Sequence, residues 1–241
     1  MAFEIIDINT VFGPWPHMRA DMSIDRLLAA LEHHNAKQAF ALSTVGVLHS
    51  HNDGNAETLK ACQEHEKLVP VATVDPRGYF GPKGALEKTA SQGFKMFRFF
   101  PVVQEWPVDH AAFHDILDEL EPVGVPLMIQ AGVTGISSAL ARVIGDRKNP
   151  VLLDGISYEN MAEAVAVMRK HENFMIETRE LRVPGALRFL VDQAGADRVV
   201  FGSGCLRSSL AAALDYIVEA EISDDNKESI LGGNVKRLLG G

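Results

Sequence analysis

Residues 198–203 read RVVFGS, a short apolar run that ends at a glycine and a serine. This pattern is typical of a buried β-strand, and seven similar runs precede it. Each run is followed by a stretch with the periodicity of an amphipathic helix. The strand-like runs cover residues 3–9, 38–44, 69–75, 94–101, 126–131, 150–154, 173–178 and 198–203. Strands that alternate with helices pair in parallel through right-handed crossovers, so the sequence predicts an α/β fold.

Eight such units in 241 residues predict a single-domain (β/α)8 TIM barrel that spans residues 1–241. The expected helices cover residues 24–34, 55–65, 82–92, 109–123, 136–146, 160–170, 184–194, 208–220 and 224–239. An open, doubly wound sheet is the alternative architecture. It is disfavoured because the chain has neither a Gly-x-x-x-x-Gly-Lys loop nor a Gly-x-Gly-x-x-Gly motif after its first strand.

Composition narrows the classes of function. The formal net charge of −9 disfavours a nucleic-acid or anionic-membrane surface as partner, and two cysteines make no disulfide framework. No basic segment precedes the first apolar run, and no stretch of about 18 apolar residues exists. We therefore expect a cytoplasmic protein without a membrane span, whose partner is a small molecule and which could form a homo-oligomer.

Two segments resemble the amidohydrolase-2 family of TIM barrels. Residues 93–101 read GFKMFRFFP, and residues 195–204 read GADRVVFGSG before a final helix. The resemblance implies a metal-dependent hydrolase, yet the family's metal ligands are replaced. Asn9 and Val11 stand where the family has histidines on its first strand, Gln130 replaces another histidine, and Gly204 replaces an aspartate.

A catalytic transition-metal site needs about three protein ligands. The amide oxygens of Asn9 and Gln130 are poor ligands, and the carboxylates of Asp7 and Asp154 alone would make a weak site. The sequence therefore predicts no metal and no other cofactor.

In a TIM barrel the chemistry lies at the carboxyl ends of the strands. We expect a diverged hydrolase or lyase that acts on a small carboxylate or ring substrate, with Asp7, Asp154 and Arg98 as catalytic residues. The predicted substrate-binding residues are Lys95, Asn9, Gln130, Trp15, His51, Glu177 and Cys205. The alternative is a non-catalytic barrel that binds a small ligand or a partner subunit, in which the carboxylates form ion pairs with the arginines and hold the mouth shut.

Three loops are open to two interpretations each. The first loop, residues 12–19 with Trp15, could be a lid over a pocket or a hydrophobic cap. His49 and His51 form a His-x-His pair that could ligate a metal or contact substrate, or they belong to a polar loop that ends at a helix cap on Asn55. Cys205 could be an activated thiol or, more commonly for a free cysteine, a buried and inert one.

Overall fold

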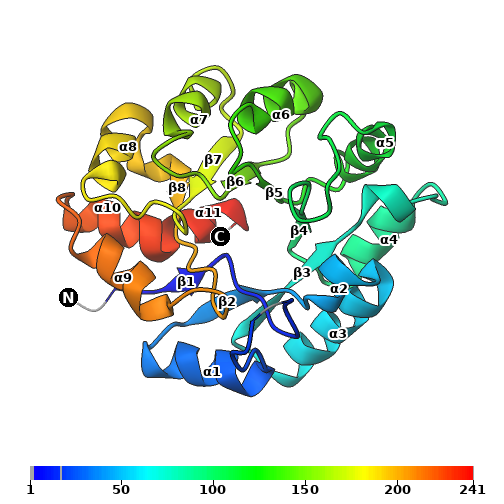
Figure 1. Ribbon diagram of the computed structural model, residues 1–241, viewed down its shortest axis with the longest axis horizontal. Helices are drawn as coiled ribbons and strands as arrows, with labels where there is room; N and C mark the ends of the chain where they lie inside the picture. The colour runs from blue at the N-terminus through cyan, green and yellow to red at the C-terminus, as the bar shows by residue number, and fades with distance from the viewer. Residues whose placement is uncertain (1–2, 17, 241) are drawn as a thin grey trace.

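The computed structural model describes residues 3–16 and 18–240. Eight parallel strands follow one another around the sheet in chain order, and helices surround them (Figure 1). The strands are β1 (Ile6–Asp7), β2 (Gln38–Ala41), β3 (Leu68–Thr73), β4 (Met96–Phe99), β5 (Leu127–Gln130), β6 (Val151–Asp154), β7 (Phe174–Glu177) and β8 (Val199–Val200).

The helices cover the outside of the sheet. They are α1 (Ile24–His33), α2 (Val45–Leu48), α3 (His51–Glu64), α4 (Ala85–Ser91), α5 (Ala111–Leu120), α6 (Ile136–Ile144), α7 (Met161–Met168), α8 (Ala186–Ala194), α9 (Leu210–Val218), α10 (Asp224–Glu228) and α11 (Asn234–Leu238). None of the helices within the described ranges is long and apolar enough to cross a membrane.

The first and last strands meet through backbone hydrogen bonds just beyond their ends. Ile8 N donates to Phe201 O at 3.0 Å, Gly204 N donates to Asn9 O at 2.8 Å, and Val11 N donates to Cys205 O at 2.7 Å. These contacts close the sheet on itself, so the predicted (β/α)8 TIM barrel is confirmed.

Alternation along the strands separates two apolar layers. On β4, Met96 and Phe100 join the interior cluster of the barrel, whereas Phe97 and Phe99 pack outward against the helices. Successive side chains of a strand point to opposite faces, so this period of two fills both layers. The polar Arg98 therefore lies on the interior face, between Met96 and Phe100.

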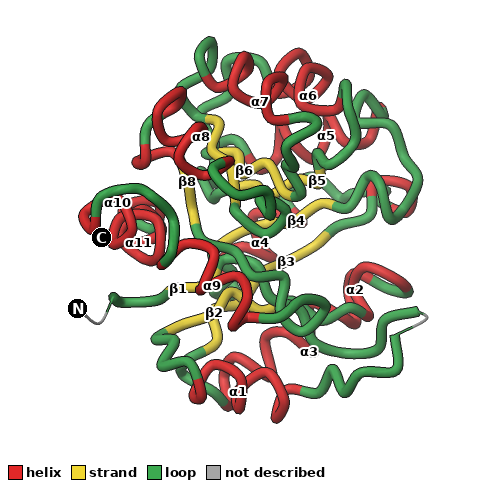
Figure 2. The backbone as a smooth tube through the Cα atoms, turned by 60° about the vertical axis from the view of Figure 1, so that its left-hand side comes forward, coloured by secondary structure: helices red, strands yellow, loops and turns green. Residues whose placement is uncertain are grey.

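The C-terminal segment closes the amino-terminal side of the barrel. A π-helical turn, Ser229–Gly233, separates α10 from α11, so the single predicted helix over 224–239 has three parts. Phe201 N donates to Ile230 O at 3.0 Å, and Val235 of α11 joins the interior cluster. Figure 2 shows this segment beside β1 and β8.

The connection after β2 differs from its prediction. Helix α2 was not expected, and α3 begins at His51 with Ser50 as its N-cap, four residues before the predicted start. Asn55 is not a cap, because its buried amide exchanges two hydrogen bonds of 2.9 Å with the backbone of Thr73.

The close approach of α2 and α3 predicts the effect of a small substitution. A Cβ on Gly54 would lie 2.0 Å from the backbone nitrogen of Gly46, so Gly54→Ala forces the two helices apart. We expect Gly54→Ala to lower the free energy of unfolding by about 1–3 kcal/mol. Gly78→Ala is the control, since a Cβ added at Gly78 would have no atom within 4 Å. Equal urea midpoints for the two variants would contradict the prediction.

Candidate functional site at the mouth of the barrel

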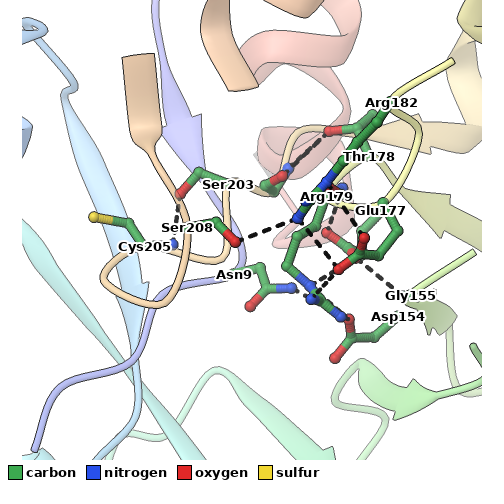
Figure 3. A network of polar contacts seen from close by, with 12 residues as sticks. Asn9, Asp154, Gly155, Glu177, Thr178, Arg179, Arg182, Ser203, Cys205 and Ser208 are labelled. Atoms are coloured by element: carbon green, nitrogen blue, oxygen red, sulfur yellow. Dashed lines mark hydrogen bonds and ion pairs between the residues drawn. The ribbon is translucent and has the colours of Figure 1, made fainter. Parts of the chain in front are cut away.

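Asp154, the last residue of β6, is the centre of a polar cluster at the carboxyl ends of the strands (Figure 3). Its Oδ2 accepts a hydrogen bond from Arg98 Nη2 at 2.7 Å, and its Oδ1 accepts one from Arg179 Nη2 at 2.9 Å. Asn9 Nδ2 lies 3.4 Å from the same Oδ1. One carboxylate thus joins β4, β6, the end of β1 and the loop after β7.

The charge balance around Asp154 keeps it ionised. Burial by itself would raise its pKa, but the positive charges of Arg98 and Arg179 outweigh burial and hold the pKa well below its usual range. The side chain of Asp154 is fully buried. A buried carboxylate with two guanidinium partners is a structural ion pair and a weak base.

Glu177, the last residue of β7, has the opposite tendency. Burial and the nearby charge of Asp154 raise the pKa of Glu177, although Arg179 opposes this effect. Its two oxygens accept backbone hydrogen bonds from Gly155 N at 3.2 Å and from Arg179 N at 3.1 Å. Glu177 is fully buried and holds the loops after β6 and β7 through these hydrogen bonds; its role as a substrate contact stays a prediction.

Asp7 links β1 to the turn after β8 through hydrogen bonds. Its Oδ1 accepts from Ser203 N and Asn9 N, both at 3.0 Å, and its Oδ2 accepts from the Ser203 hydroxyl. Burial raises the pKa of Asp7 to about 6, although the hydrogen bonds from Ser203 counteract the effect. Because Asp7 is fully buried and all these contacts are internal, the structure does not present it to a ligand as a catalytic residue.

Arg98 and Lys95 do not form the predicted anion site. Arg98 is 2% exposed, pairs with Asp154 and packs over the ring of Phe100 at 4.8 Å, so its guanidinium is enclosed by other protein groups. Lys95 is exposed just before β4, and the alternation places it with Phe97 on the outer face. It therefore lies at the amino-terminal end of the barrel, away from Asp154.

Two predicted contacts, Trp15 and His51, lie at the edge of the cluster or outside it. Trp15 packs partly buried against the interior cluster, which favours the cap over the lid, and Arg207 stacks on its ring at 4.2 Å. His17, in the same loop, lies outside the described residues. His51 begins α3, half-buried, and burial lowers its pKa.

Cys205 is not a reactive thiol. The side chain is 3% exposed, and burial together with the negative charge of Asp7 raises the pKa of the thiol to about 12. A nucleophilic cysteine requires a lowered pKa and access to solvent. The inert interpretation of Cys205 therefore fits the structure, and its role as a substrate contact does not.

The sequence indicated Arg179, two residues beyond β7, only as an ion-pair partner of the carboxylates at the mouth and gave it no role in a site. Its side chain, 10% exposed, passes between two glycines with positive φ, Gly155 at 89° and Gly204 at 72°. A Cβ on Gly204 would lie 2.2 Å from Arg179 Cδ, so the arginine fills the space of any side chain at position 204. An arginine shortly after a strand, opposite a glycine where the family resemblance expects an aspartate, was the available signal.

Arg179 reaches a cleft of about 280 Å³ at the mouth. Gln130 lines this cleft with Asp154, Gly155 and Ser157, and its side-chain oxygen accepts a hydrogen bond from Val103 N at 3.2 Å. A guanidinium and an amide nitrogen in one small cleft are donors suited to a carboxylate.

The side chains at the mouth do not fit a catalytic metal. Among the residues that the structure describes, no group of three His, Cys, Asp or Glu side chains could hold a metal ion. Asn9 points its amide nitrogen at Asp154, and the oxygens of Asp154 face two guanidinium groups. We derive no step through a metal from this geometry.

Comparison with known proteins shows which family the chain belongs to. A family model described as amidohydrolase matches residues 32–241. The chain belongs to the amidohydrolase family. No curated protein matches it.

Solved structures share the amidohydrolase fold at low sequence identity. A proposed 2-pyrone-4,6-dicarboxylic acid hydrolase from Pseudomonas putida is 16% identical, with a TM-score of 0.77 over 100% of this chain and 98% of that one. A 5-carboxyvanillate decarboxylase from Sphingomonas paucimobilis is 15% identical, with a TM-score of 0.73 over 99% of both chains. A 2,6-dihydroxybenzoate decarboxylase in complex with 2,6-dihydroxybenzoate is 13% identical, with a TM-score of 0.77 over 100% of both chains.

The buried ion pair predicts a large cost for removing its shared charge. Asp154→Asn leaves the buried Arg98 without a counterion and removes one of the carboxylate partners of Arg179, so we expect the free energy of unfolding to fall by about 3–5 kcal/mol. Asp118→Asn is the control, because Asp118 is 65% exposed and pairs with Arg147 on the surface, where a change of about 0–1 kcal/mol is expected. A similar small change in both variants would refute the structural role of Asp154.

Asp7 predicts a pH dependence of stability. The folded protein binds the Asp7 proton more tightly than the unfolded chain, so ionisation of Asp7 opposes folding. Its contribution to stability is present below pH 3.8 and is lost as the pH rises to about 6. A shift of this size corresponds to about 3 kcal/mol.

In Asp7→Asn, this loss of stability should disappear, because an amide oxygen can still accept from Ser203 N without carrying a charge. Urea unfolding between pH 4 and pH 7.5 measures the difference from the wild type. Asp109→Asn, at an exposed position, is the control and should keep the wild-type slope. An unchanged slope in Asp7→Asn would contradict the raised pKa.

Proposed function

We propose that the chain is a hydrolase or lyase of the amidohydrolase family that acts on a small carboxylate without a catalytic metal. One observation carries the proposal: Arg179 occupies the space beside Gly204 and brings a fixed positive charge to the mouth cleft. The names of the structural neighbours support a carboxylate as the substrate class, since they are a dicarboxylic acid hydrolase and two decarboxylases.

A guanidinium can supply the stabilisation that such reactions need. Hydrolysis of an acyl bond builds negative charge on an oxygen, and decarboxylation leaves an electron pair that an adjacent acceptor must take up. A preorganised cation aimed at the developing charge stabilises either transition state. Asp154 accepts a hydrogen bond from Arg179 and fixes its position. Because this pairing lowers the pKa of Asp154, the carboxylate suits positioning of Arg179 and not proton exchange.

The remaining groups of the cleft suit recognition of the substrate. Gln130, at the end of β5, and Ser157, in the loop after β6, line the cleft with Arg179 and add neutral donors and acceptors. Val102 and Val133 line the same cleft and offer apolar contact to a ring. A planar carboxylate on a ring would therefore find one charged donor, polar neighbours and an apolar edge.

The second candidate is a non-catalytic barrel that binds the same class of ligand. It is favoured by the pairing of the cleft's acids: among the described residues that line the cleft, the carboxylates are Asp154 and Glu180, and both pair with Arg179. Neither is free to exchange a proton with a ligand. Measuring substrate turnover distinguishes the two candidate functions, whereas measuring ligand binding does not.

The test uses protein purified with a chelator and checked for metals by mass spectrometry. We expect this protein to convert at least one of 2-pyrone-4,6-dicarboxylate, 5-carboxyvanillate and 2,6-dihydroxybenzoate, with rates unaffected by EDTA or by added Mn²⁺. Arg179→Lys keeps the charge but loses the two-pronged geometry, so kcat/KM should fall by about 100-fold.

Arg188→Lys, on the exposed surface of α8, is the matched control and should keep the wild-type kcat/KM. Turnover that appears only with added Mn²⁺ or Zn²⁺ would overturn the metal-free mechanism. A wild type that binds these carboxylates but converts none of them would establish the non-catalytic candidate.

A further inference from the structure

A second cleft lies on the other side of Arg179, between the loops that follow β7 and β8. Its volume is about 450 Å³, and the start of α9 forms one wall. Arg179, Arg182 and Arg207 line it together with Ser203, Ser208 and Tyr216. Arg179, Arg182, Ser203 and Ser208 are labelled in Figure 3. Neither Asp154 nor Gln130 lines this cleft, so it is separate from the proposed reaction site.

The lining carries an excess of positive charge. It includes three arginines, and no carboxylate is among the described residues that line it. Glu180 pairs with both Arg179 and Arg182 from outside the lining. Within residues 3–16 and 18–240, no carboxylate pairs directly with Arg207; Asp154 and Glu180 attract its charge from beyond salt-bridge distance.

Arg207 is nevertheless held in place. Its guanidinium stacks on the Trp15 ring at 4.2 Å, which fixes the plane and leaves its N–H edges without protein acceptors among the described residues. Burial and repulsion from Arg179 and Arg98 lower its pKa, as expected where cations crowd together. A fixed planar guanidinium with free N–H groups matches the two-pronged geometry of carboxylate and phosphate.

Neighbouring groups favour the same ligand class. Ser208 Oγ lies 3.5 Å from Arg182 Nη2, which places a hydroxyl beside the cationic groups. Helix α9 begins with the capping residue Ser209, and the positive end of its dipole faces this wall. In TIM barrels, the loops after the seventh and eighth strands are a frequent place for anion binding.

We propose that this cleft binds an oxyanion group, a phosphate or a second carboxylate, through Arg207 with Arg182 and Ser208. The site recognises one anionic group and leaves the mouth cleft free. A ligand with two anionic groups could span both clefts across Arg179, which lines each of them.

Calorimetric titration of the whole chain tests the proposal with two probes, inorganic phosphate and malonate, at constant ionic strength set with NaCl. We expect saturable binding of one probe, and Arg207→Gln should weaken it by about tenfold or more. Arg182→Gln should weaken it less, because Arg182 is 62% exposed and already pairs with Glu180. Tighter binding of phosphate identifies a phosphoryl group as the ligand, and tighter binding of malonate identifies a carboxylate.

Arg188→Gln is the matched control, since it removes the same charge from the outer surface of α8. Thermal unfolding verifies that each variant is folded. If Arg207→Gln does not fold, Arg207→Lys is used in its place, because lysine keeps the positive charge but lacks the two-pronged geometry of a guanidinium. The proposal is overturned if neither probe binds, if the Arg207 variant binds like the wild type, or if Arg188→Gln loses as much affinity. These outcomes do not depend on turnover, so the proposed reaction can fail while this site stands.

Discussion

The ion pair of Asp154 with Arg98 and Arg179 is the interaction on which the mouth of this barrel depends. It joins one carboxylate, buried in the interior, to the guanidinium groups of β4 and of the loop after β7. Desolvation of three charges is costly, and only the mutual attraction and the added hydrogen bond from Asn9 offset it. Since each member is needed to balance the others, the cluster sets the positions of four strand ends at once.

Glycines make room for this cluster. A Cβ on Gly202 would lie 2.2 Å from Glu177 Oε2, so the buried glutamate fits only because that position has no side chain. Gly155 and Gly204, with their positive φ values, likewise leave a channel for Arg179. The polar centre is therefore packed as tightly as the apolar layers around it, and the open volume lies on its flanks, in the two clefts that share Arg179.

The sequence predicted the barrel well because its signal is local. The apolar runs and the helical periodicity repeat eight times, and the order of the units leaves few ways to pair the strands. The site was harder, because the direction and the partners of a charged side chain depend on contacts between distant residues. Asp154 was correctly placed at a strand end, but the burial of Arg98 and the outward face of Lys95 follow from the strand register. The sequence allowed an ion pair between Arg179 and the carboxylates at the mouth, but its central position depends on two glycines, 49 positions apart, that open a path for it.

The crowding at Gly204 makes the residue at position 204 depend on the residue at position 179. An aspartate at 204 alone would collide with Arg179 and would force a backbone with φ of 72° on a residue with a side chain. Loss of Arg179 alone would leave Asp154 with Arg98 as its one guanidinium partner. Each single change therefore disturbs a contact of the buried cluster. In related sequences, glycine at the first position and arginine at the second should be inherited together.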